Sequence, residues 1–258
     1  MTAATTKVLP LTFSGGAAVV TGAASGIGAA IARTLMSAGI RTIRLDIHTP
    51  GVDPAFGADL QVCVSADVRD RDMAERLAAA EVAVDDISYL VNCAGILDNT
   101  GFSGVDRDTW MRCLEVNLVG AYNLIDALGP ALRSAATAAV VNVTSIEASR
   151  VVALTDPDPT PQYAASKAGL LMLTKSAARA LAADGVRVNS VSPGFVATAM
   201  AAPHGDTSKL SSALAPRIPV GRFAQAGEIA SAVAFLLSDQ AGYITGTDLC
   251  IDGGFGLS

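Results

Sequence analysis

The chain has 258 residues, of which 51% are hydrophobic and 16% are charged, a composition that supports one large core over residues 1–258. Its formal net charge is −6 and it has no run of basic residues, which argues against a nucleic-acid partner. No apolar run reaches the ~18 residues that span a membrane, and the N-terminal stretch lacks the apolar region of a secretory signal, so we expect a cytoplasmic protein without a membrane partner.

Short runs rich in β-branched residues alternate with longer helical stretches along the chain. The predicted strands span residues 17–21, 41–46, 61–65, 89–92, 139–143, 187–191 and 249–251. The predicted helices span residues 26–37, 71–83, 108–134, 162–183 and 227–238. This alternation predicts an α/β fold, and we expect a single Rossmann-like, doubly wound domain with a seven-stranded, mostly parallel sheet.

The first predicted strand runs into a helix through a turn that contains Gly22, Gly26 and Gly28. Glycines let the backbone approach a ligand closely, and the start of a helix offers unpaired N–H groups to a pyrophosphate. A glycine triplet alone also fits an ordinary tight turn. This one opens a strand–helix–strand unit, which predicts that the turn, including Ser25 and Ile27, binds a dinucleotide.

The second predicted strand ends at Asp46, which follows Gly28 by 18 residues. An acidic side chain at this place accepts hydrogen bonds from the adenosine ribose hydroxyls and repels a 2′-phosphate. The flanking residues Ser25 and Ile47 supply no cation that would hold such a phosphate. The sequence therefore predicts NAD as the cofactor, bound in part by Asp46 and Ile47.

Histidine and cysteine usage limits the possible chemistry. The two histidines, His48 and His204, lie far apart, and no G-x-S-x-G motif is present. Both facts argue against a histidine-based metal site and a Ser-His-Asp triad, and we expect no metal. Cys63, Cys93 and Cys250 lie in apolar, strand-like stretches and are expected to be buried thiols in a reducing compartment.

The spacing T-G-x-x-x-G-x-G, from Thr21 to Gly28, resembles the short-chain dehydrogenase/reductase family, and further motifs follow in the family's order to the end of the chain. One departure is Cys93, which replaces the second Asn of the family's N-N-A-G segment. The resemblance implies additional cofactor contacts in the D-V pair, the N-C-A-G segment and the P-G-x-V-x-T segment. These contacts fall on Asp67, Val68, Asn92, Ala94, Gly95, Pro193, Gly194, Val196 and Thr198.

The family's catalytic positions match Asn117, Ser145, Tyr163 and Lys167. Tyr163 and Lys167 are four residues apart on a predicted helix and share one face. A free tyrosine has a pKa of about 10, and we expect the adjacent ammonium and the positive nicotinamide of the cofactor to lower it. The resemblance implies that Tyr163 transfers the proton and Lys167 also holds the nicotinamide ribose. It further implies that Ser145, rather than the neighbouring hydroxyl of Thr144, binds the substrate oxygen, and that Asn117 holds a relay water.

We expect substrate contacts from Ser145, Glu147, Tyr163 and Phe195, although a solvated side chain is an equal alternative for Glu147. The remaining pocket residues are expected to be mostly apolar. They are Leu97, Val151, Val152, Met200 and Leu210, with Asp98 as a polar addition. Such a pocket suits a secondary alcohol or ketone of moderate size.

Two proline-rich segments are expected to be surface loops beside the substrate. Residues 154–161 form an insertion between Ser145 and Tyr163, and residues 199–219 form a lid. The high apolar content indicates a homo-oligomer, and the resemblance implies a tetramer that packs the helices carrying Asn117 and Tyr163 across an interface.

The sequence thus predicts an oxidoreductase that transfers a hydride between NAD(H) and a small-molecule secondary alcohol or ketone. An NADPH-dependent 3-ketoacyl-thioester reductase is one alternative, against which Asp46 argues. A catalytically silent NAD-sensing or scaffold protein is another. The complete Asn117, Ser145, Tyr163 and Lys167 set argues against it, because a sensor needs no proton relay.

Overall fold

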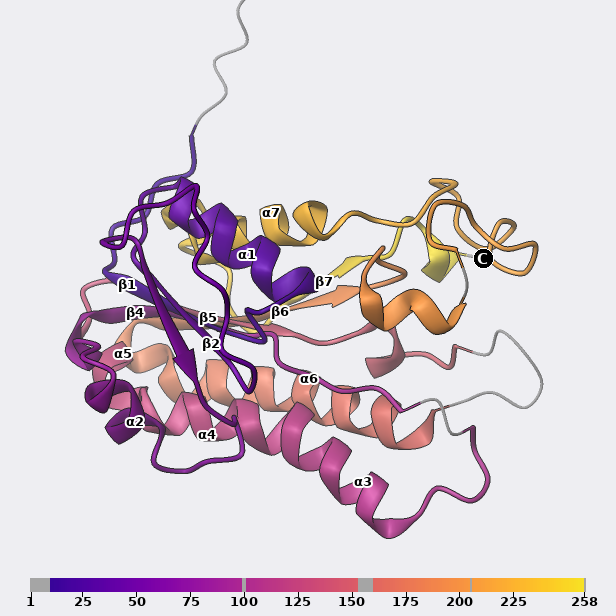
Figure 1. Cartoon of the computed structure of the whole chain (residues 1–258), viewed down its shortest axis with the longest axis horizontal. Helices are drawn as coiled ribbons and strands as arrows, with labels where there is room; N and C mark the ends of the chain where they lie inside the picture. Colours follow the sequence, from indigo (N-terminus) through magenta and orange to yellow (C-terminus); the bar gives the residue numbers. More distant parts are fainter. Residues whose placement is uncertain (1–9, 99–100, 153–159, 205, 258) are drawn as a thin grey trace, which may run out of the picture.

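Seven parallel strands form the sheet at the centre of the molecule, in the order β3-β2-β1-β4-β5-β6-β7 (Figure 1). The computed structural model describes residues 10–98, 101–152, 160–204 and 206–257. The strands are β1 (Ala17–Thr21), β2 (Thr42–Asp46), β3 (Gln61–Ser65), β4 (Ile87–Asn92), β5 (Ala138–Val143), β6 (Val186–Pro193) and β7 (Asp248–Ile251). The expected Rossmann-like α/β fold is confirmed, and the sheet is parallel throughout.

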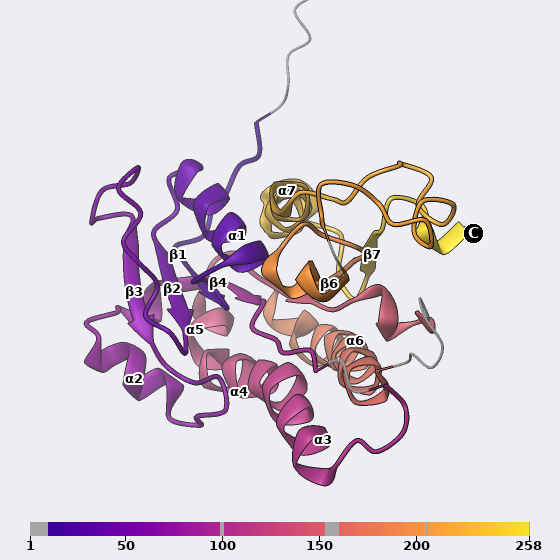
Figure 2. The same ribbon diagram turned by 45° about the vertical axis from the view of Figure 1, so that its right-hand side comes forward.

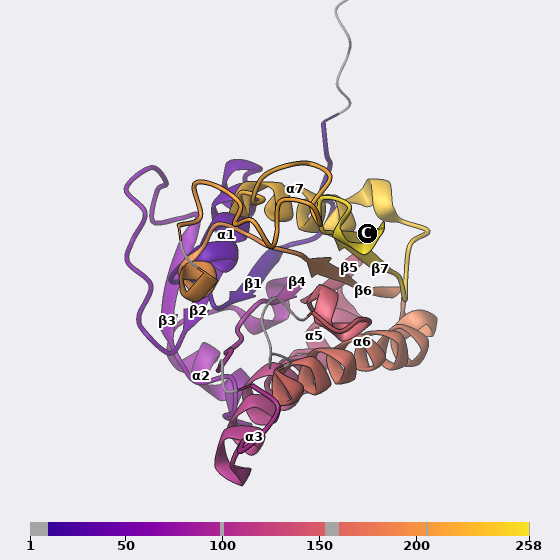
Figure 3. The same cartoon turned by 90° about the vertical axis from the view of Figure 1, so that its right-hand side faces the viewer.

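Helices cover both faces of this sheet. They are α1 (Gly26–Ser37), α2 (Met73–Ala79), α3 (Arg107–Leu114), α4 (Gly120–Ala127), α5 (Gly129–Ser134), α6 (Pro161–Leu181) and α7 (Ala226–Leu237). Helices α1 and α7 pack together on one face, and α2, α4, α5 and α6 lie on the other (Figures 2 and 3). Among the described residues, no helix is long and apolar enough to cross a membrane.

Each central strand is buried on both sides, which explains its continuous apolar sequence. Successive side chains of a strand point to opposite faces, so Val19 joins the core under α2, α4, α5 and α6, whereas Val20 joins the core under α1 and α7. Full burial of one such side chain contributes about 1.5–3 kcal/mol. The two cores together therefore hold the helices on the sheet.

The prediction of one continuous helix over residues 108–134 is wrong, because the segment is interrupted twice. Helix α3 passes into a π-helical turn, Glu115–Val119, before α4 begins, and Asn117 lies at the centre of that turn. A π turn adds one residue to the helical turn and often marks a functional position. A second break precedes α5, where Pro130 cannot donate a backbone hydrogen bond.

Helix α2 is shorter than the predicted 71–83. Glu81 adopts a left-handed conformation with φ of 58°, and Val82 N–H donates back to Leu77 O, so the helix closes before this point. The expected burial of all three strand cysteines is also wrong. Cys250 is exposed and Cys63 is only half-buried, because β7 and β3 are the two edge strands of the sheet, and Cys93, which follows β4, is half-buried as well.

The chain reverses its direction of travel across the sheet between β1 and β4. From β1 the chain continues outward to β2 and β3, and it then returns to β4 on the other side of β1. The loops after β1 and β4 therefore diverge and leave a crevice at the carboxyl ends of the strands. The predicted binding turn after β1 lies at this crevice.

The turn after β1 requires glycine at two positions. Gly22 has φ of 67°, and a Cβ there would approach the backbone N of Ala94 to 2.9 Å. Gly28 has ordinary helical geometry, but a Cβ on it would overlap the carbonyl of Gly22. The strand, the turn and the start of α1 are thus packed backbone against backbone.

We predict that Gly28→Ala lowers the free energy of unfolding by about 1–3 kcal/mol, because the added methyl meets backbone atoms that cannot move aside. Chemical denaturation measures this change. Gly227→Ala is the matched control, since Gly227 also lies in the first turn of a helix but has open space where the added methyl would lie. Equal stabilities of the two variants would contradict the packing described for the turn.

Candidate active site

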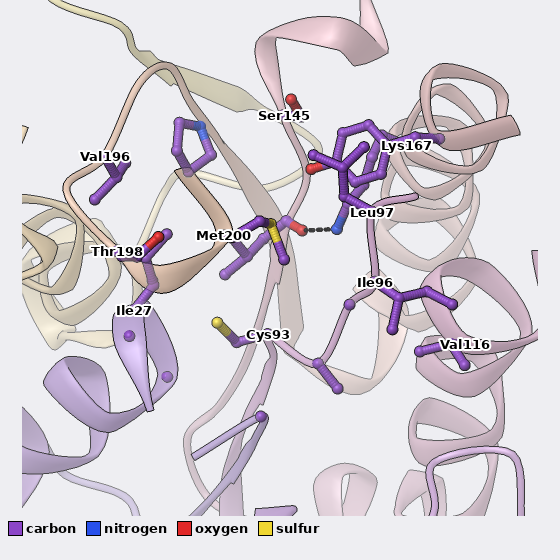
Figure 4. A pocket seen from close by; sticks show the side chains of 18 of the residues that line it. Ile27, Cys93, Ile96, Leu97, Val116, Ser145, Lys167, Val196, Thr198 and Met200 are labelled. Atoms are coloured by element: carbon purple, nitrogen blue, oxygen red, sulfur yellow. Dashed lines mark hydrogen bonds between the residues drawn. The ribbon is translucent and has the colours of Figure 1, made fainter. Parts of the chain in front are cut away.

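A cavity of about 640 Å³ lies at the carboxyl ends of the strands. Ile27 and Thr198 line one side of it, and Ile96 and Val116 line the other (Figure 4). Nearly all of the sequence-predicted site residues contribute to its wall. They are Gly22, Ser25, Gly26, Ile27, Gly28, Asp46, Ile47, Asp67, Val68, Ala94, Gly95, Ser145, Glu147, Tyr163, Lys167, Pro193, Gly194, Phe195, Val196 and Thr198.

The end of the cavity formed by the glycine turn suits an anion. Ser25 is the residue before α1, yet its side chain does not cap the helix, and the first turn of α1 has no acidic residue. The positive end of the helix dipole and the first N–H groups are therefore not compensated by the protein's own carboxylates. Gly26, with φ of 54°, also lines this end of the cavity.

The carboxylate of Asp46 braces the same turn. Its two oxygens accept hydrogen bonds from Ala24 N and His48 N, each at 3.0 Å. The side chain lines the cavity beside Ile47, which is 58% exposed and offers no charge. Asp46 thus places a negative charge where a ribose of a bound nucleotide is expected.

Sequence reasoning missed a cation at this end of the cavity, Arg69. It lines the wall, and its Nε and Nη2 donate hydrogen bonds to the Asp67 carboxylate, with N–O distances of 2.6–3.1 Å. The hydrogen bond from Arg69 holds the pKa of Asp67 below its usual range. The D-x-R spacing is the local signal that predicts such a pair. Because Arg69 is already paired with Asp67, it is not an isolated cation facing Asp46.

Asn92 was predicted to bind the cofactor, but its side chain does not line the cavity. Its Nδ2 donates to Oδ1 of Asn142 at 2.9 Å, inside the core. The reason is register: Asn92 and Asn142 are paired across β4 and β5, and their side chains leave the sheet on the same face. Asn92 therefore stabilises the core next to the site and does not line the cavity.

The segment after β4 is held by Thr21. Its Oγ1 accepts hydrogen bonds from the N–H groups of Cys93 and Ala94, both at 3.0 Å. This contact fixes the backbone where Cys93 departs from the family pattern. The Cys93 thiol lines the cavity, and burial raises its pKa to about 12, so it is neutral at physiological pH.

Asn117 does not line the cavity, and its amide is committed to the wall behind it. Its Oδ1 accepts from Ile96 N at 2.8 Å, and its Nδ2 donates to Ile96 O at 2.9 Å and to Ser166 Oγ at 3.0 Å. Ser166 Oγ in turn donates to Tyr163 O at 2.7 Å. Asn117 thus connects the segment after β4 to the helix that carries Tyr163.

The predicted catalytic side chains meet at the other end of the cavity. The Ser145 hydroxyl forms a hydrogen bond with the Tyr163 phenol and accepts one from Glu147 N at 3.2 Å. Lys167 lies on the same face of α6 as Tyr163, with Nζ 5.7 Å from the ring centroid. Its Nζ donates to Val143 O at 2.8 Å (Figure 4). A hydroxyl, a phenol and an ammonium therefore share one buried corner.

The protein's own side chains do not produce the expected lowering of the Tyr163 pKa. Burial raises the pKa of the phenol, and the charge of Glu147 raises it further, whereas the hydrogen bond from Ser145 lowers it. Burial also lowers the pKa of Lys167 to about 8. The spacing of Tyr163 and Lys167 in the sequence predicts that they are neighbours, but it does not show that both side chains lose their contact with water. That loss is the largest contribution to both pKa shifts.

The substrate side of the cavity combines apolar and charged residues. Leu97, Val152, Met200 and Phe195 contribute to its wall as predicted, whereas Val151 is 73% exposed and Leu210 packs in a small core beneath the wall. That core joins residues 199–219 to Phe195 and to the C-terminal Phe255. Residues 153–159, most of the predicted insertion, lie outside the described part of the chain.

Two charged groups occupy this side. Asp98 lines the cavity as expected and binds Arg112 Nη2 at 2.8 Å. Arg112 also lines the wall and was not predicted, because it lies on α3, and no local motif connects it to Asp98. Oε2 of Glu147 accepts a hydrogen bond from Thr160 Oγ1 at 2.9 Å. Among the described residues, no group of His, Cys, Asp or Glu side chains is arranged to hold a metal ion.

Comparison with known proteins finds relatives over nearly the whole chain. A family model described as enoyl-(acyl carrier protein) reductase matches residues 22–256. Galactitol 2-dehydrogenase (L-tagatose-forming) of Cereibacter sphaeroides is 36% identical, over 93% of this chain and 95% of that protein. A 3-oxoacyl-(acyl-carrier-protein) reductase of Haemophilus influenzae is also 36% identical, over 93% of this chain and 98% of that protein.

A solved structure of a short-chain type dehydrogenase/reductase from Mycobacterium marinum has a TM-score of 0.83 to this structure and 26% sequence identity. The match covers 96% of this chain and 98% of that one. The fold and the sequence therefore indicate the same family over nearly the full length of the chain. The chain belongs to the short-chain dehydrogenase/reductase family, whose members are NAD(P)-dependent oxidoreductases of alcohols and ketones.

Proposed function

We propose that this protein transfers a hydride between NAD(H) and a secondary alcohol or its ketone, with Tyr163 as the general acid/base. The observation that carries the proposal is the cavity itself, which joins the glycine turn and Asp46 at one end to Ser145, Tyr163 and Lys167 at the other. A single ligand that reaches both ends is a dinucleotide.

The residues present fit NAD. Gly22 and Gly26 have positive φ and leave the backbone open toward the cavity, and α1 begins there without a capping side chain. The glycine turn would hold the pyrophosphate, Asp46 the adenosine ribose and Lys167 the nicotinamide ribose. When bound, NAD⁺ supplies the hydride acceptor and a positively charged ring.

The protein's own side chains then supply proton transfer and placement. Ser145 is positioned to donate a hydrogen bond to the substrate oxygen, since its hydroxyl already reaches the Tyr163 phenol. Tyr163 removes the hydroxyl proton during oxidation and returns it during reduction. Asn117 and Ser166 fix the backbone around Ile96 and Tyr163. A positive charge held against the phenol opposes the effect of burial on its pKa.

The preference for NAD over NADP is proposed on the charge of Asp46. Its carboxylate lines the cavity beside uncharged Ile47 and Ser25, and a 2′-phosphate there would be repelled. Arg69 does not alter this argument, because it is paired with Asp67.

A largely apolar substrate of moderate size is proposed from the wall formed by Ile96, Leu97, Val152, Phe195 and Met200. The name of the Cereibacter relative describes the oxidation of a polyol, which supports an alcohol as the substrate but not its apolar character. The name of the Haemophilus relative supports the alternative, an acyl-carrier thioester. An acidic carrier would meet a protein of net charge −6 without a basic run, which disfavours the encounter.

A homo-oligomer, specifically a tetramer, is also proposed. Large apolar side chains are exposed at Val119, Tyr122 and Met172, on and beside the helices that carry the site, and again at Tyr243 and Leu257. Burial of such groups against a second copy is favourable. Sedimentation velocity of the full chain at micromolar concentration is expected to show a tetramer, and monomer alone would contradict the proposal.

The unpaired state of all four cysteines supports a cytoplasmic location.

Replacing Tyr163 with Phe should lower kcat by about 10²-fold or more, because it removes the transferable proton and nearly preserves shape. NAD binding, measured by calorimetry, should be retained. Tyr243→Phe is the control, since Tyr243 is fully exposed and should leave the rate unchanged. A Tyr163→Phe variant that keeps more than roughly a tenth of wild-type kcat would rule out the assigned role.

Replacing Asp46 with Asn should lower the ratio of kcat/KM for NAD⁺ to kcat/KM for NADP⁺ by at least about tenfold, since it removes the charge that repels the 2′-phosphate. Asn keeps one acceptor oxygen, for Ala24 N, and loses only the contact with His48 N, so the glycine turn should remain intact. Asp126→Asn, at an exposed carboxylate on α4 outside the cavity, is the control for the loss of one negative charge. A wild type that prefers NADP⁺, or an unchanged ratio in Asp46→Asn, would show that Asp46 does not select the cofactor.

A further inference from the structure

Glu147 is a carboxylate built into the wall next to the proposed catalytic hydroxyl. It lies in the short turn Ile146–Ala148, which begins directly after Ser145, and its own N–H donates to Ser145 Oγ at 3.2 Å. Ile146 anchors this turn in the small core with Leu214 and Phe255. Both the position of Glu147 and that of Ser145 are therefore set by the same backbone.

The side chain of Glu147 is held at its far end as well. Oε2 accepts a hydrogen bond at 2.9 Å from the hydroxyl of Thr160, the buried residue that precedes α6. Glu147 thus connects the turn after β5 to the start of the helix that carries Tyr163. The carboxylate remains part of the cavity wall, alongside Ser145 and Tyr163.

The charge of Glu147 works against the reaction of a plain alcohol. The titratable groups around the Tyr163 phenol are Glu147, Lys167 on the same helix, and the thiols of Cys93 and Cys113. Burial raises the pKa of both thiols, which are neutral, so Glu147 is the negative charge that opposes formation of the phenolate. A simple hydrophobic substrate gains nothing from this carboxylate.

We propose that Glu147 is a specificity-determining residue that accepts a hydrogen bond from a donor group, a hydroxyl or an ammonium, on the carbon next to the reacting carbon of the substrate. This inference rests on the proposed function and narrows its substrate class. Proximity to Ser145, which binds the reacting oxygen, places the second group on a neighbouring carbon. The donor also spreads the carboxylate charge and weakens its effect on Tyr163.

The same geometry selects against a substrate with a negative group at that carbon. A carboxylate of the substrate would meet Glu147 in a partly buried wall, where like charges repel strongly. Arg112 does not compensate, since it already pairs with Asp98. Glu147 is thus expected to favour diols and amino alcohols over monoalcohols and to disfavour 2-hydroxy acids.

Two variants separate the charge of Glu147 from its contact with Thr160. Glu147→Gln removes the charge but keeps an acceptor oxygen for Thr160 Oγ1. Thr160→Val removes the contact and keeps the charge. The probes are four ring compounds of one size: cyclohexanol, cis-1,2-cyclohexanediol, 2-aminocyclohexanol and 2-hydroxycyclohexanecarboxylate. Steady-state kcat/KM is measured for each with NAD⁺ and NADP⁺.

The wild type should prefer the diol or the amino alcohol, and which of the two is preferred identifies the donor. Glu147→Gln should lower kcat/KM for the preferred compound by about tenfold, as for loss of a charged hydrogen bond, while the rate with cyclohexanol is maintained or rises. The rise of kcat/KM for cyclohexanol with increasing pH, which follows deprotonation of Tyr163, should move to lower pH, because the Tyr163 pKa falls. Thr160→Val should keep the wild-type preference.

Different failures have different meanings. If the wild type oxidises these compounds but Glu147→Gln leaves their relative kcat/KM values unchanged, the role of Glu147 is overturned and the proposed function stands. Equal losses for all four compounds in both variants show a purely structural contact and also overturn it. If the wild type, with NAD bound in calorimetry, turns over none of the four with either cofactor, the proposed function fails, and the inference falls with it.

Discussion

All seven strands run in the same direction, and the candidate site depends on that constraint. Residues that follow a parallel strand lie at one edge of the sheet, so the glycine turn after β1, Asp46 at the end of β2 and Ser145 after β5 meet there although 123 residues separate the first glycine from Ser145. Helix α6 then crosses the sheet and brings Tyr163 and Lys167 to the same edge. The site is therefore a property of the sheet's polarity and not of any one segment.

Burial gives the proton-transfer corner its character. The Tyr163 phenol loses water, which raises its pKa, and the Lys167 ammonium loses water, which lowers its pKa to about 8. Both shifts disfavour the charged forms on which alcohol oxidation depends. In the proposed function, a cofactor with a positive ring binds beside the phenol, and its charge would oppose the rise in the Tyr163 pKa that burial causes.

Much of the fold and of the site was predictable from the sequence, for identifiable reasons. Buried strands such as Ala17–Thr21 are short β-branched or apolar runs, and the ordered spacing of glycines, Asp46, Ser145 and Tyr163 indicated the residues that share the cavity. The direction in which individual side chains point was harder to predict from the sequence. Asn92 and Asn142 face each other in the core because of the register between β4 and β5, and register is not visible until the strands are paired.

Other features arise from long-range burial or from local geometry without a sequence signal. The π turn around Asn117 interrupts a segment with an ordinary helical pattern. Arg112 lies on helix α3 and is held at the cavity by its hydrogen bond to Asp98. The direction of the Tyr163 pKa shift could not be predicted from the sequence. The spacing shows that a lysine is nearby, but the desolvation of both side chains follows only from the packing around them.

The central claim is that Tyr163 is a buried phenol that becomes a usable base only when a positive charge is held beside it. Tyrosinate absorbance, measured against pH as the difference between wild type and Tyr163→Phe, isolates this one tyrosine from the other three. We expect Tyr163 to titrate above pH 10, the ordinary value, in the protein alone, and at clearly lower pH when NAD⁺ is bound. Titration at or below pH 10 without NAD⁺, or no change when NAD⁺ binds, would contradict it.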